Sequence, residues 1–376
     1  MNYRSQGGTL DLRTNSGLAA IKEAGLWDEF QKHGRYDGQY MAIVDKSLGY
    51  HFVRPPSFGG PGGESPEIDR HKLREILVDS LPEGIIHWGH RLKKVEDGNT
   101  LVFENTTKGG YHIIVGADGA WSKVRNHVAP DLKPVYTGVA GFDMSIPDAE
   151  NTAPETYKIV NRGSVFACGE GQRFTIQQMG DGSLHVYPSF VREDPDWMLR
   201  EKCGYDSHNI AEAKAALAKE FSDWCPELRD AISAAQGSCV PRSLYILPVG
   251  TRWDHKPGFT LIGDAAHLMS PHAGEGVNQA LEDAMLLARA ITGALGNDKI
   301  LDDEITAFEI KMFGRAKKVQ KLSYDLCQDW MFTPGSPKSV MPRAISRHLN
   351  SALPWVLHPL GTAGVYSFYF FKNMFS

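Results

Sequence analysis

The sequence lacks the short patterns that mark most metal-binding and hydrolytic proteins. Its five cysteines are scattered and none forms a C-x-x-C pair, so neither a disulfide framework nor a cysteine metal site is indicated, and reduced thiols are expected. It contains no H-E-x-x-H and no G-x-S-x-G, which argues against a zinc peptidase and an α/β-hydrolase. We therefore expect no metal site.

The sequence also has no large excess of positive or negative charge and no evident targeting signal. The net charge is −5 and no basic run is interleaved with aromatic residues, so a nucleic-acid partner is not expected. Residues Met1 to Leu12 are polar and do not have the pattern of a signal peptide. Together with the reduced cysteines, this favours a cytoplasmic location.

The C-terminal segment is without charge. From His348 to Phe371 there is no Lys, Arg, Asp or Glu, and the segment ends in the aromatic run YSFYFF. A membrane span needs about 20 apolar residues, and Pro354 and Pro359 interrupt this one. We expect the tail to pack on the body of the protein, with membrane contact as the alternative.

The most informative stretch is Leu261 to Ala284, LIGDAAHLMSPHAGEGVNQALEDA, called here the GD segment. A short apolar strand runs into Gly263-Asp264, and an amphipathic helix begins near Val277. Glycine lets a backbone approach a flat ligand, a carboxylate at a strand end can accept hydrogen bonds from a polyol, and a helix N-terminus favours an anionic ring. A reduced flavin has such a ring, and its ribityl chain is such a polyol.

A second strand–turn–helix unit, ADGAWSKVR, lies earlier in the chain and is called here the DG segment. The apolar residues from Tyr111 to Ala117 predict a buried strand, which ends in Asp118-Gly119 and leads into a helix. The alternative to a cofactor role is that Asp118 caps this helix.

Two helix starts are predicted nearer the N-terminus. Asn15 or Ser16 can cap a helix that runs to about Ala24. Asp69 can cap a helix whose first turn contains Arg70. On its own, Arg70 would be interpreted as a solvated surface charge.

Between Val135 and about Pro257 the chain changes character. Alternating strands recur at 138–146, 157–159, 165–168, 173–178 and 183–190, and a helix from Ile210 to Trp224 crosses them. This pattern predicts an inserted, mostly antiparallel sheet. Polar strand residues that could line a substrate pocket, and that are equally consistent with solvated or packed positions, are Glu170, Arg173, Gln177 and His185.

These segments resemble the aromatic-hydroxylase-like FAD monooxygenases (class A flavoprotein monooxygenases), and within them the tetracycline-inactivating branch. The shared stretches are GGTLDLR-x-x-SG, SPEIDR, the DG and GD segments, and EFSDW at Glu220 to Trp224. The resemblance implies that NADPH reduces FAD, and that a flavin C4a-hydroperoxide formed with O₂ hydroxylates an aromatic, polyketide or tetracycline-like small molecule. It also implies a role in secondary metabolism or antibiotic inactivation, and we expect a monomer.

The resemblance assigns roles to individual residues. Arg4 would lie on the NADPH phosphate side, Asp11 and Arg70 beside the flavin, Asp118 near the FAD phosphates and Asp264 at the ribityl chain. No catalytic triad is implied, because the chemistry is centred on the flavin. The implied cofactor-binding residues are Arg4, Asp11, Arg70, Asp118, Gly119, Gly263, Asp264, Pro271, Gly274, Gly276, Val277 and Asn278.

The expected fold class is α/β, with a Rossmann-like FAD-binding domain of the glutathione-reductase type at 1–134 and 257–300. The inserted sheet at 135–256 would be the substrate domain, and 301–376 would hold C-terminal helices and the apolar tail.

In the family, a first βαβ unit with G-x-G-x-x-G precedes the stretch that opens this chain, and no such pattern occurs in its 376 residues. We expect the strands at 113–117 and 259–262 to lack a neighbour, and the chain as written to be poorly soluble or to purify without flavin colour. The alternative is therefore a truncated, non-catalytic remnant or an incomplete gene model that does not retain FAD.

Two other enzyme classes are alternatives. A NAD-only dehydrogenase would not need the GD segment. A flavin halogenase would want W-x-W-x-I-P, which the eight tryptophans do not form.

Overall fold

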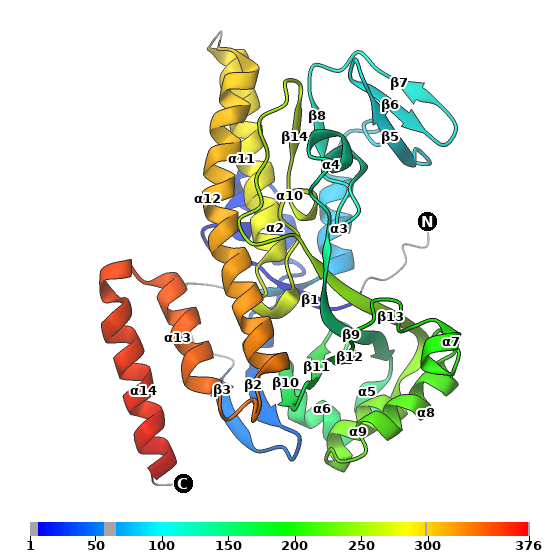
Figure 1. Cartoon of the computed structure of the whole chain (residues 1–376), viewed down its shortest axis with the longest axis vertical. Coiled ribbons are helices and arrows are strands. Elements are labelled where there is room, and N and C mark those ends of the chain that lie inside the picture. The colour runs from blue at the N-terminus through cyan, green and yellow to red at the C-terminus, as the bar shows by residue number, and fades with distance from the viewer. Residues whose placement is uncertain (1–6, 56–64, 298, 375–376) are drawn as a thin grey trace.

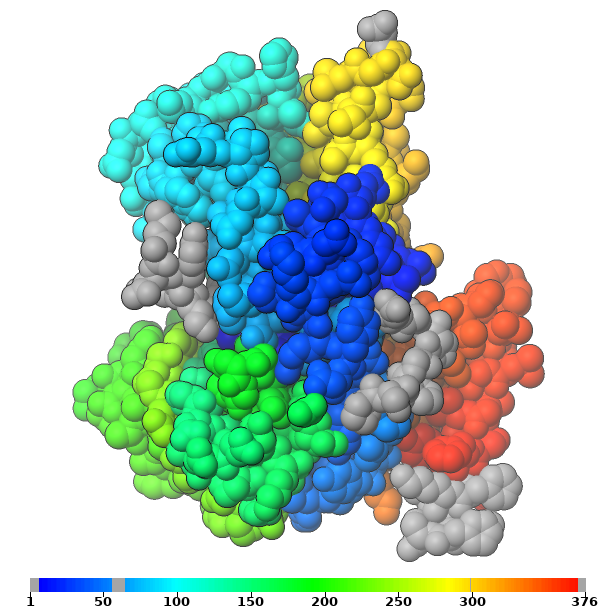
Figure 2. All heavy atoms as spheres, turned by 180° about the vertical axis from the view of Figure 1, so that it is seen from behind, coloured from blue at the N-terminus to red at the C-terminus, as the bar shows by residue number. Residues whose placement is uncertain are grey.

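The computed structural model describes residues 7–55, 65–297 and 299–374. Figure 1 shows two parts stacked along the long axis, with the helix α11 beside the upper part, the longer helix α12 continuing down to the lower part, and a helical arm at one side. Seen from behind, the N-terminal segment lies across the junction of the two parts (Figure 2). The predicted candidate residues come from both sides of this junction.

The lower part is built on one large sheet. Within the described residues its order is β13-β9-β12-β11-β10-β2-β3, and every neighbouring pair is antiparallel except β10 with β2. The mostly antiparallel sheet is thus confirmed. The strands are β2 (Met41–Asp45), β3 (Tyr50–Arg54), β9 (Val135–Ile146), β10 (Ser164–Gly169), β11 (Gln172–Gln178), β12 (Leu184–Val191) and β13 (Gln236–Ile246).

This sheet crosses the domain boundary drawn from the sequence, because β2 and β3 come from within 1–134. The neighbouring strands β2 and β3 form a hairpin, but β2 also pairs in parallel with β10, more than a hundred residues further along the chain. Sequence periodicity indicates which residues form a strand and carries no information on a partner so distant.

Short helices cover one face of the large sheet. Strand residues such as Phe142, Phe174 and Val186 form an apolar core with Phe221 and Trp224. The helices of this part are α5 (Ala149–Thr152), α6 (Pro154–Val160), α7 (Arg200–Cys203), α8 (Ile210–Glu220) and α9 (Pro226–Ala234).

The upper part carries the GD and DG segments. In the described residues β14 (Phe259–Leu261) pairs in parallel with β8 (Ile114–Gly116), and these two form a sheet of their own. Smaller sheets are β1 (Thr9–Asp11) with β4 (Glu67–Asp69), and β5 (Leu92–Glu96) with β6 (Thr100–Phe103) and β7 (Thr107–Lys108). The helices are α1 (Gly17–Glu23), α2 (Trp27–Gln31), η1 (Asp37–Gln39), α3 (Arg70–Asp79), α4 (Lys123–Val128), α10 (Asp264–His267), η2 (Pro271–Ala273) and α11 (Gly276–Gly296).

The C-terminal part is helical. The long helix α12 passes into a π-helical turn, and a hairpin of two helices follows. No helix in the described part of the chain is both long and apolar enough to cross a membrane. The elements are α12 (Leu301–Cys327), η3 (Gln328–Phe332), α13 (Met341–Ala352), η4 (Trp355–Leu357) and α14 (His358–Met374).

Three local predictions differ from the structure. The predicted strand at 157–159 is the helix α6, which starts at Pro154 and buries Thr156 and Val160 one turn apart. Asp69 and Ser16 do precede helices, but neither side chain caps its helix. Asp69 instead accepts the Gly180 N–H at 3.1 Å, because tertiary partners compete with the helix end for such side chains.

Candidate functional site

The GD segment folds as a sharp strand-to-helix turn. Gly263 has φ +59° and ψ −142°, a conformation that essentially only glycine adopts, and a Cβ there would lie 3.3 Å from the Cβ of Ala280. The turn brings the start of α10 close against α11. It leaves Asp264 at the end of the strand, where the sequence pattern predicts it.

Asp264 is surrounded by positive charge. Its side chain is exposed to solvent, and no hydrogen bond to its carboxylate is found among the described residues. Burial by the surrounding protein raises its pKa, while His267, Arg70 and Arg125 act to lower it. A recessed but accessible carboxylate without a partner is free to accept hydrogen bonds from a ligand.

A buried carboxylate that the sequence reasoning missed holds this turn in place. Asp283 of α11 is fully buried and accepts the Gly263 N–H at 2.9 Å, and it lies 2.6 Å from His267 Nε2. Arg315 of α12 pairs with the other oxygen of Asp283. The sequence does contain an indication of this buried role: Asp283 is a charged residue on the apolar face of the predicted helix, between Ala280 and Leu287.

The 271–278 loop, which the resemblance places on the flavin ring, is bound to the segment after β1. Asn278 is fully buried; its Oδ1 accepts the Arg13 N–H at 2.8 Å, and its Nδ2 donates to the Asp11 carbonyl at 2.8 Å. Arg13 also pairs with Glu275 at 3.3 Å. The structure therefore brings Asp11 together with this loop, as expected.

The side chain of Asp11 has a carboxylate oxygen without a hydrogen-bond partner. Its Oδ1 is buried without a hydrogen-bond partner, and burial raises the pKa of the carboxyl despite the nearby Arg13, Arg54 and Arg35. Buried polar atoms in native proteins are nearly always satisfied, so this atom marks a place where a ligand or solvent molecule belongs.

The DG segment reaches the same turn from the other side. The N-cap of α4 is Ser122, whose Oγ accepts the Arg125 N–H at 2.8 Å. Asp118 also bonds the start of this helix, accepting the N–H of Lys123 at 2.6 Å, which is close to the structural role given above as the alternative. Gly119 has φ +78°. Arg125, a buried residue whose role was not foreseen, donates from Nη1 to the Ala265 carbonyl at 3.0 Å and so ties α4 to the GD turn.

Arg173 lies on the second face of the large sheet, close enough to the 271–278 loop for its charge to act on His272. This residue of β11 is 9% exposed, its guanidinium lies over the ring of Phe166, and its Nε has no hydrogen-bond partner. No carboxylate among the described residues pairs with it. Burial, with the Arg173 charge as second cause, holds the pKa of His272 well below its usual range.

The other predicted substrate residues lie elsewhere. Gln177 donates to Thr9 Oγ1 at 3.3 Å, and His185 packs on Gly7 and Gly8 while its Nε2 lies 2.9 Å from Asp143. Both therefore support the strand β1. Glu170 is exposed in the turn between β10 and β11.

The remaining predicted cofactor residues sit around the GD turn, apart from Arg4, which lies outside the described residues. Arg70 is the first residue of α3, and its guanidinium interacts electrostatically with the carboxylates of Asp264 and Asp143. Gly276 begins the 21-residue helix α11, and Val277 packs beside the apolar cluster of β1 and α1. Pro271 opens η2, and Gly274 closes it with φ +66°.

These groups suit the flavin ring and the ribityl chain of FAD. An accessible carboxylate for the ribityl hydroxyls, the N-terminus of a long helix and an unsatisfied buried oxygen at Asp11 converge at the turn. Asp264, Asp11 and the 271–278 loop are the groups that would hold the cofactor. The fold and site thus define a flavin-binding α/β oxidoreductase with an inserted substrate sheet.

Comparison with known proteins agrees. The FAD binding domain family matches residues 249–303, which contain the GD turn. Monooxygenase penA of Penicillium thymicola is 26% identical over 365 residues, covering 84% of this chain and 83% of that protein. Klebsiella pneumoniae HpxO, solved with FAD and uric acid, has a TM-score of 0.70 at 18% identity, covering 96% and 87% of the two chains. The tetracycline destructase Tet(51) has a TM-score of 0.67 at 18% identity, covering 93% and 87%.

These similarities support an FAD-dependent monooxygenase of the aromatic-hydroxylase type, with FAD as the cofactor.

Proposed function

We propose that this enzyme oxidises NADPH and inserts one atom of O₂ into an aromatic, polyketide or tetracycline-like molecule with an acidic hydroxyl group. The balance is substrate–H, O₂, NADPH and a proton giving substrate–OH, water and NADP⁺. Bound FAD supplies the electron transfer and the activation of oxygen.

The observation that carries the substrate class is Arg173. Its guanidinium is buried and, in the described part of the chain, has no acidic partner. A buried cation is stable only when its charge is compensated, so an anionic ligand group is the natural partner. A phenolate or enolate provides such a group and is also the electron-rich form that accepts an electrophilic oxygen.

The neighbouring residues support this assignment. His272 stays neutral through the physiological range, because burial and Arg173 lower its pKa. Neutral His272 therefore adds no second positive charge beside Arg173, and it does not compensate the charge of Arg173. Asp264 and Asp11 would hold the FAD, with Arg70 beside them, and Asp118, Gly119 and Arg4 are assigned to phosphate groups by the resemblance alone.

The test is oxygen incorporation. Protein with FAD and NADPH is supplied with ¹⁸O₂ and a panel of phenols, enols and their O-methyl ethers, and NADPH oxidation and product mass are followed. We expect one ¹⁸O atom in hydroxylated products of the free phenols or enols, and little turnover of the ethers. Equal turnover of the ethers would overturn the substrate class, and absence of ¹⁸O from every product would overturn the monooxygenase reaction.

A further inference from the structure

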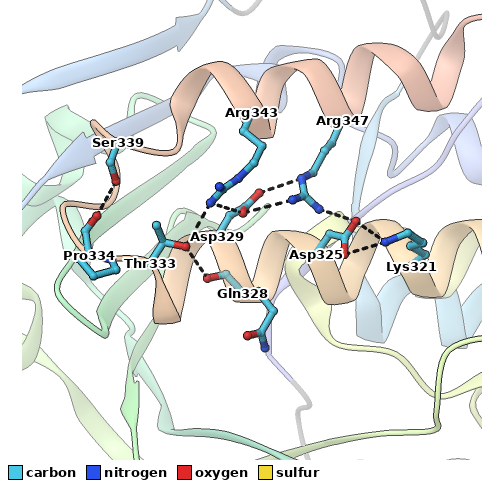
Figure 3. Close-up of polar contacts among 9 residues, drawn as sticks. All are labelled: Lys321, Asp325, Gln328, Asp329, Thr333, Pro334, Ser339, Arg343 and Arg347. Atoms are coloured by element: carbon cyan, nitrogen blue, oxygen red, sulfur yellow. Dashed lines mark hydrogen bonds and ion pairs between the residues drawn. The ribbon is translucent and has the colours of Figure 1, made fainter. Parts of the chain in front are cut away.

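The C-terminal hairpin of α13, η4 and α14 stands at the edge of the molecule (Figure 1). The two arginines of α13 face inward, toward α12 and η3. Arg343 Nη2 lies 2.7 Å from Asp329 Oδ1, and Arg347 Nε lies 3.0 Å from Asp329 Oδ2. Arg347 also pairs with Asp325, and Figure 3 shows the two arginines reaching from α13 to these carboxylates. Asp329 is only 2% exposed, so the hairpin is attached by charge pairs that are partly shielded from water.

The solvent-exposed surface of η4 and α14 has the opposite character. Large apolar side chains are exposed along it, and no Lys, Arg, Asp or Glu occurs from His348 to Phe371. The tail was expected to pack on the body, yet among residues 348–370, whose side chains the structure describes, only Tyr369 is buried. The exposed fractions are 79% for Trp355, 59% for Val356, 73% for Leu360, 62% for Phe368 and 66% for Phe370.

A groove of about 630 Å³ separates the hairpin from β3. Its walls are almost wholly apolar and include Phe52, Ile345 and Leu349. The exposed side chains of Leu360 and Phe368 line its rim, so the groove opens onto the exposed surface of α14. Gly364 of α14 lines the groove at an open position, because a Cβ built there would meet no atom within 4 Å. The groove is remote from the GD turn in sequence and shares no residue with it.

We propose that the hairpin docks the enzyme on a lipid bilayer, with the outer face of α14 in the interface and the groove receiving an acyl chain. A soluble protein partner would be expected to meet a polar rim, with Arg among the contact residues. The outward face offers no charged group over the whole uncharged segment. Trp and Tyr beside exposed aliphatic residues, here Trp355 and Tyr366, are instead the side chains that favour a membrane interface.

The first experiment is vesicle flotation of the full chain. With neutral phosphatidylcholine vesicles the protein is expected to float, and neither high salt nor added phosphatidylserine should change the bound fraction, because the docking face carries no charge. The combined variant Trp355→Ala, Leu360→Ser, Phe368→Ser should lose most of the binding.

A matched control removes exposed apolar residues elsewhere. Ile85, Leu295 and Ile310 are 60%, 76% and 64% exposed, and changing all three to Ser should leave flotation unchanged. For the groove, Gly364→Phe should weaken vesicle binding several-fold. Gly293→Phe, at another open helical glycine, should not.

Fluorescence gives an independent measure. Phosphatidylcholine with brominated acyl chains should quench part of the tryptophan emission of the wild type, and Trp355→Phe should remove that part. The proposal is overturned if the wild type does not float, or if the triple variant and its control float equally. It is also overturned if light scattering shows a dimer that the triple variant converts to a monomer, since a second copy would then cover the face.

Discussion

The two faces of the large sheet differ sharply although they belong to the same strands. On β11, Phe174 faces the helices, is fully buried and lies 4.4 Å from the ring of Phe221. Its neighbour Arg173 faces the 271–278 loop instead and has no acidic partner in the described residues. Successive strand residues point to opposite faces of a sheet, so Phe174 packs in the core while its neighbour Arg173 lies on the face proposed to bind substrate.

The faces also differ in how well their groups are satisfied. The helix-covered face is a continuous apolar core. The other face holds buried atoms without hydrogen-bond partners, among them Arg173 Nε and His185 Nδ1. Native proteins leave few such atoms, so the buried Nε of Arg173 indicates a place where a ligand can complete the structure.

The largest effect is expected on the packed face. Phe174→Ala removes a ring that also contacts Trp224, and truncating a buried Phe costs about 3–5 kcal/mol of unfolding free energy. Denaturant unfolding measures the loss. FAD affinity of the fraction that remains folded should stay near the wild-type value, and a loss of FAD affinity matching the loss of stability would contradict the division between the faces.

Arg173→Met tests the opposite face. Losing a hydrogen bond to a charged group costs about 1.5–3 kcal/mol, so KM for a phenolic substrate should rise roughly 10- to 100-fold. Stability should hold or increase, because a buried cation without an acidic partner is removed. Arg192→Met is the control, since Arg192 pairs with Glu220 at 2.7 Å; an equal rise in KM there would refute a specific role for Arg173.

The flavin turn gives a smaller, structural test. Gly263→Ala forces a backbone conformation that costs a non-glycine residue about 1–3 kcal/mol and crowds Ala280. We expect a lowered melting temperature together with weaker FAD binding. Gly293→Ala in α11 should show neither effect, and tight FAD binding by Gly263→Ala would mean that the turn does not position the cofactor.

The smallest effect concerns pH. His272 has a lowered pKa in the folded state, so it takes up its proton more readily when unfolded. Its stabilising contribution is full above the unfolded pKa of about 6.5 and declines as the pH falls below it. The wild type should therefore lose more melting temperature on acidification than His272→Gln. Arg173→Met should show an intermediate loss, and identical pH profiles for all three would exclude this titration.

Local pattern was sufficient for some of these features and insufficient for others. The strand β14, the helix α11 and the place of Asp264 between them follow from a continuous motif. The residues that hold this motif in place could not be predicted from it, because Arg315 lies 32 residues from Asp283 and Arg125 lies 140 residues from Ala265. Such contacts arise from the packing of whole elements, and only a charged residue at a buried helix position hints at them.

The substrate residues show the same limit. Alternation correctly indicated a sheet, but it could not say which polar side chains face the flavin loop. Of the four candidates, Arg173 meets that loop, Gln177 and His185 support β1, and Glu170 is exposed.

The central claim is that Asp264 belongs to the cofactor side of the site and Arg173 to the substrate side. A fluorescence titration of FAD into the wild type, Asp264→Ala and Arg173→Met tests it directly. We expect Asp264→Ala to weaken FAD roughly 10- to 100-fold, from the loss of a charge-assisted hydrogen bond, and Arg173→Met to bind FAD like the wild type. Unchanged affinity in Asp264→Ala, or an equal loss in both variants, would contradict this division of the site.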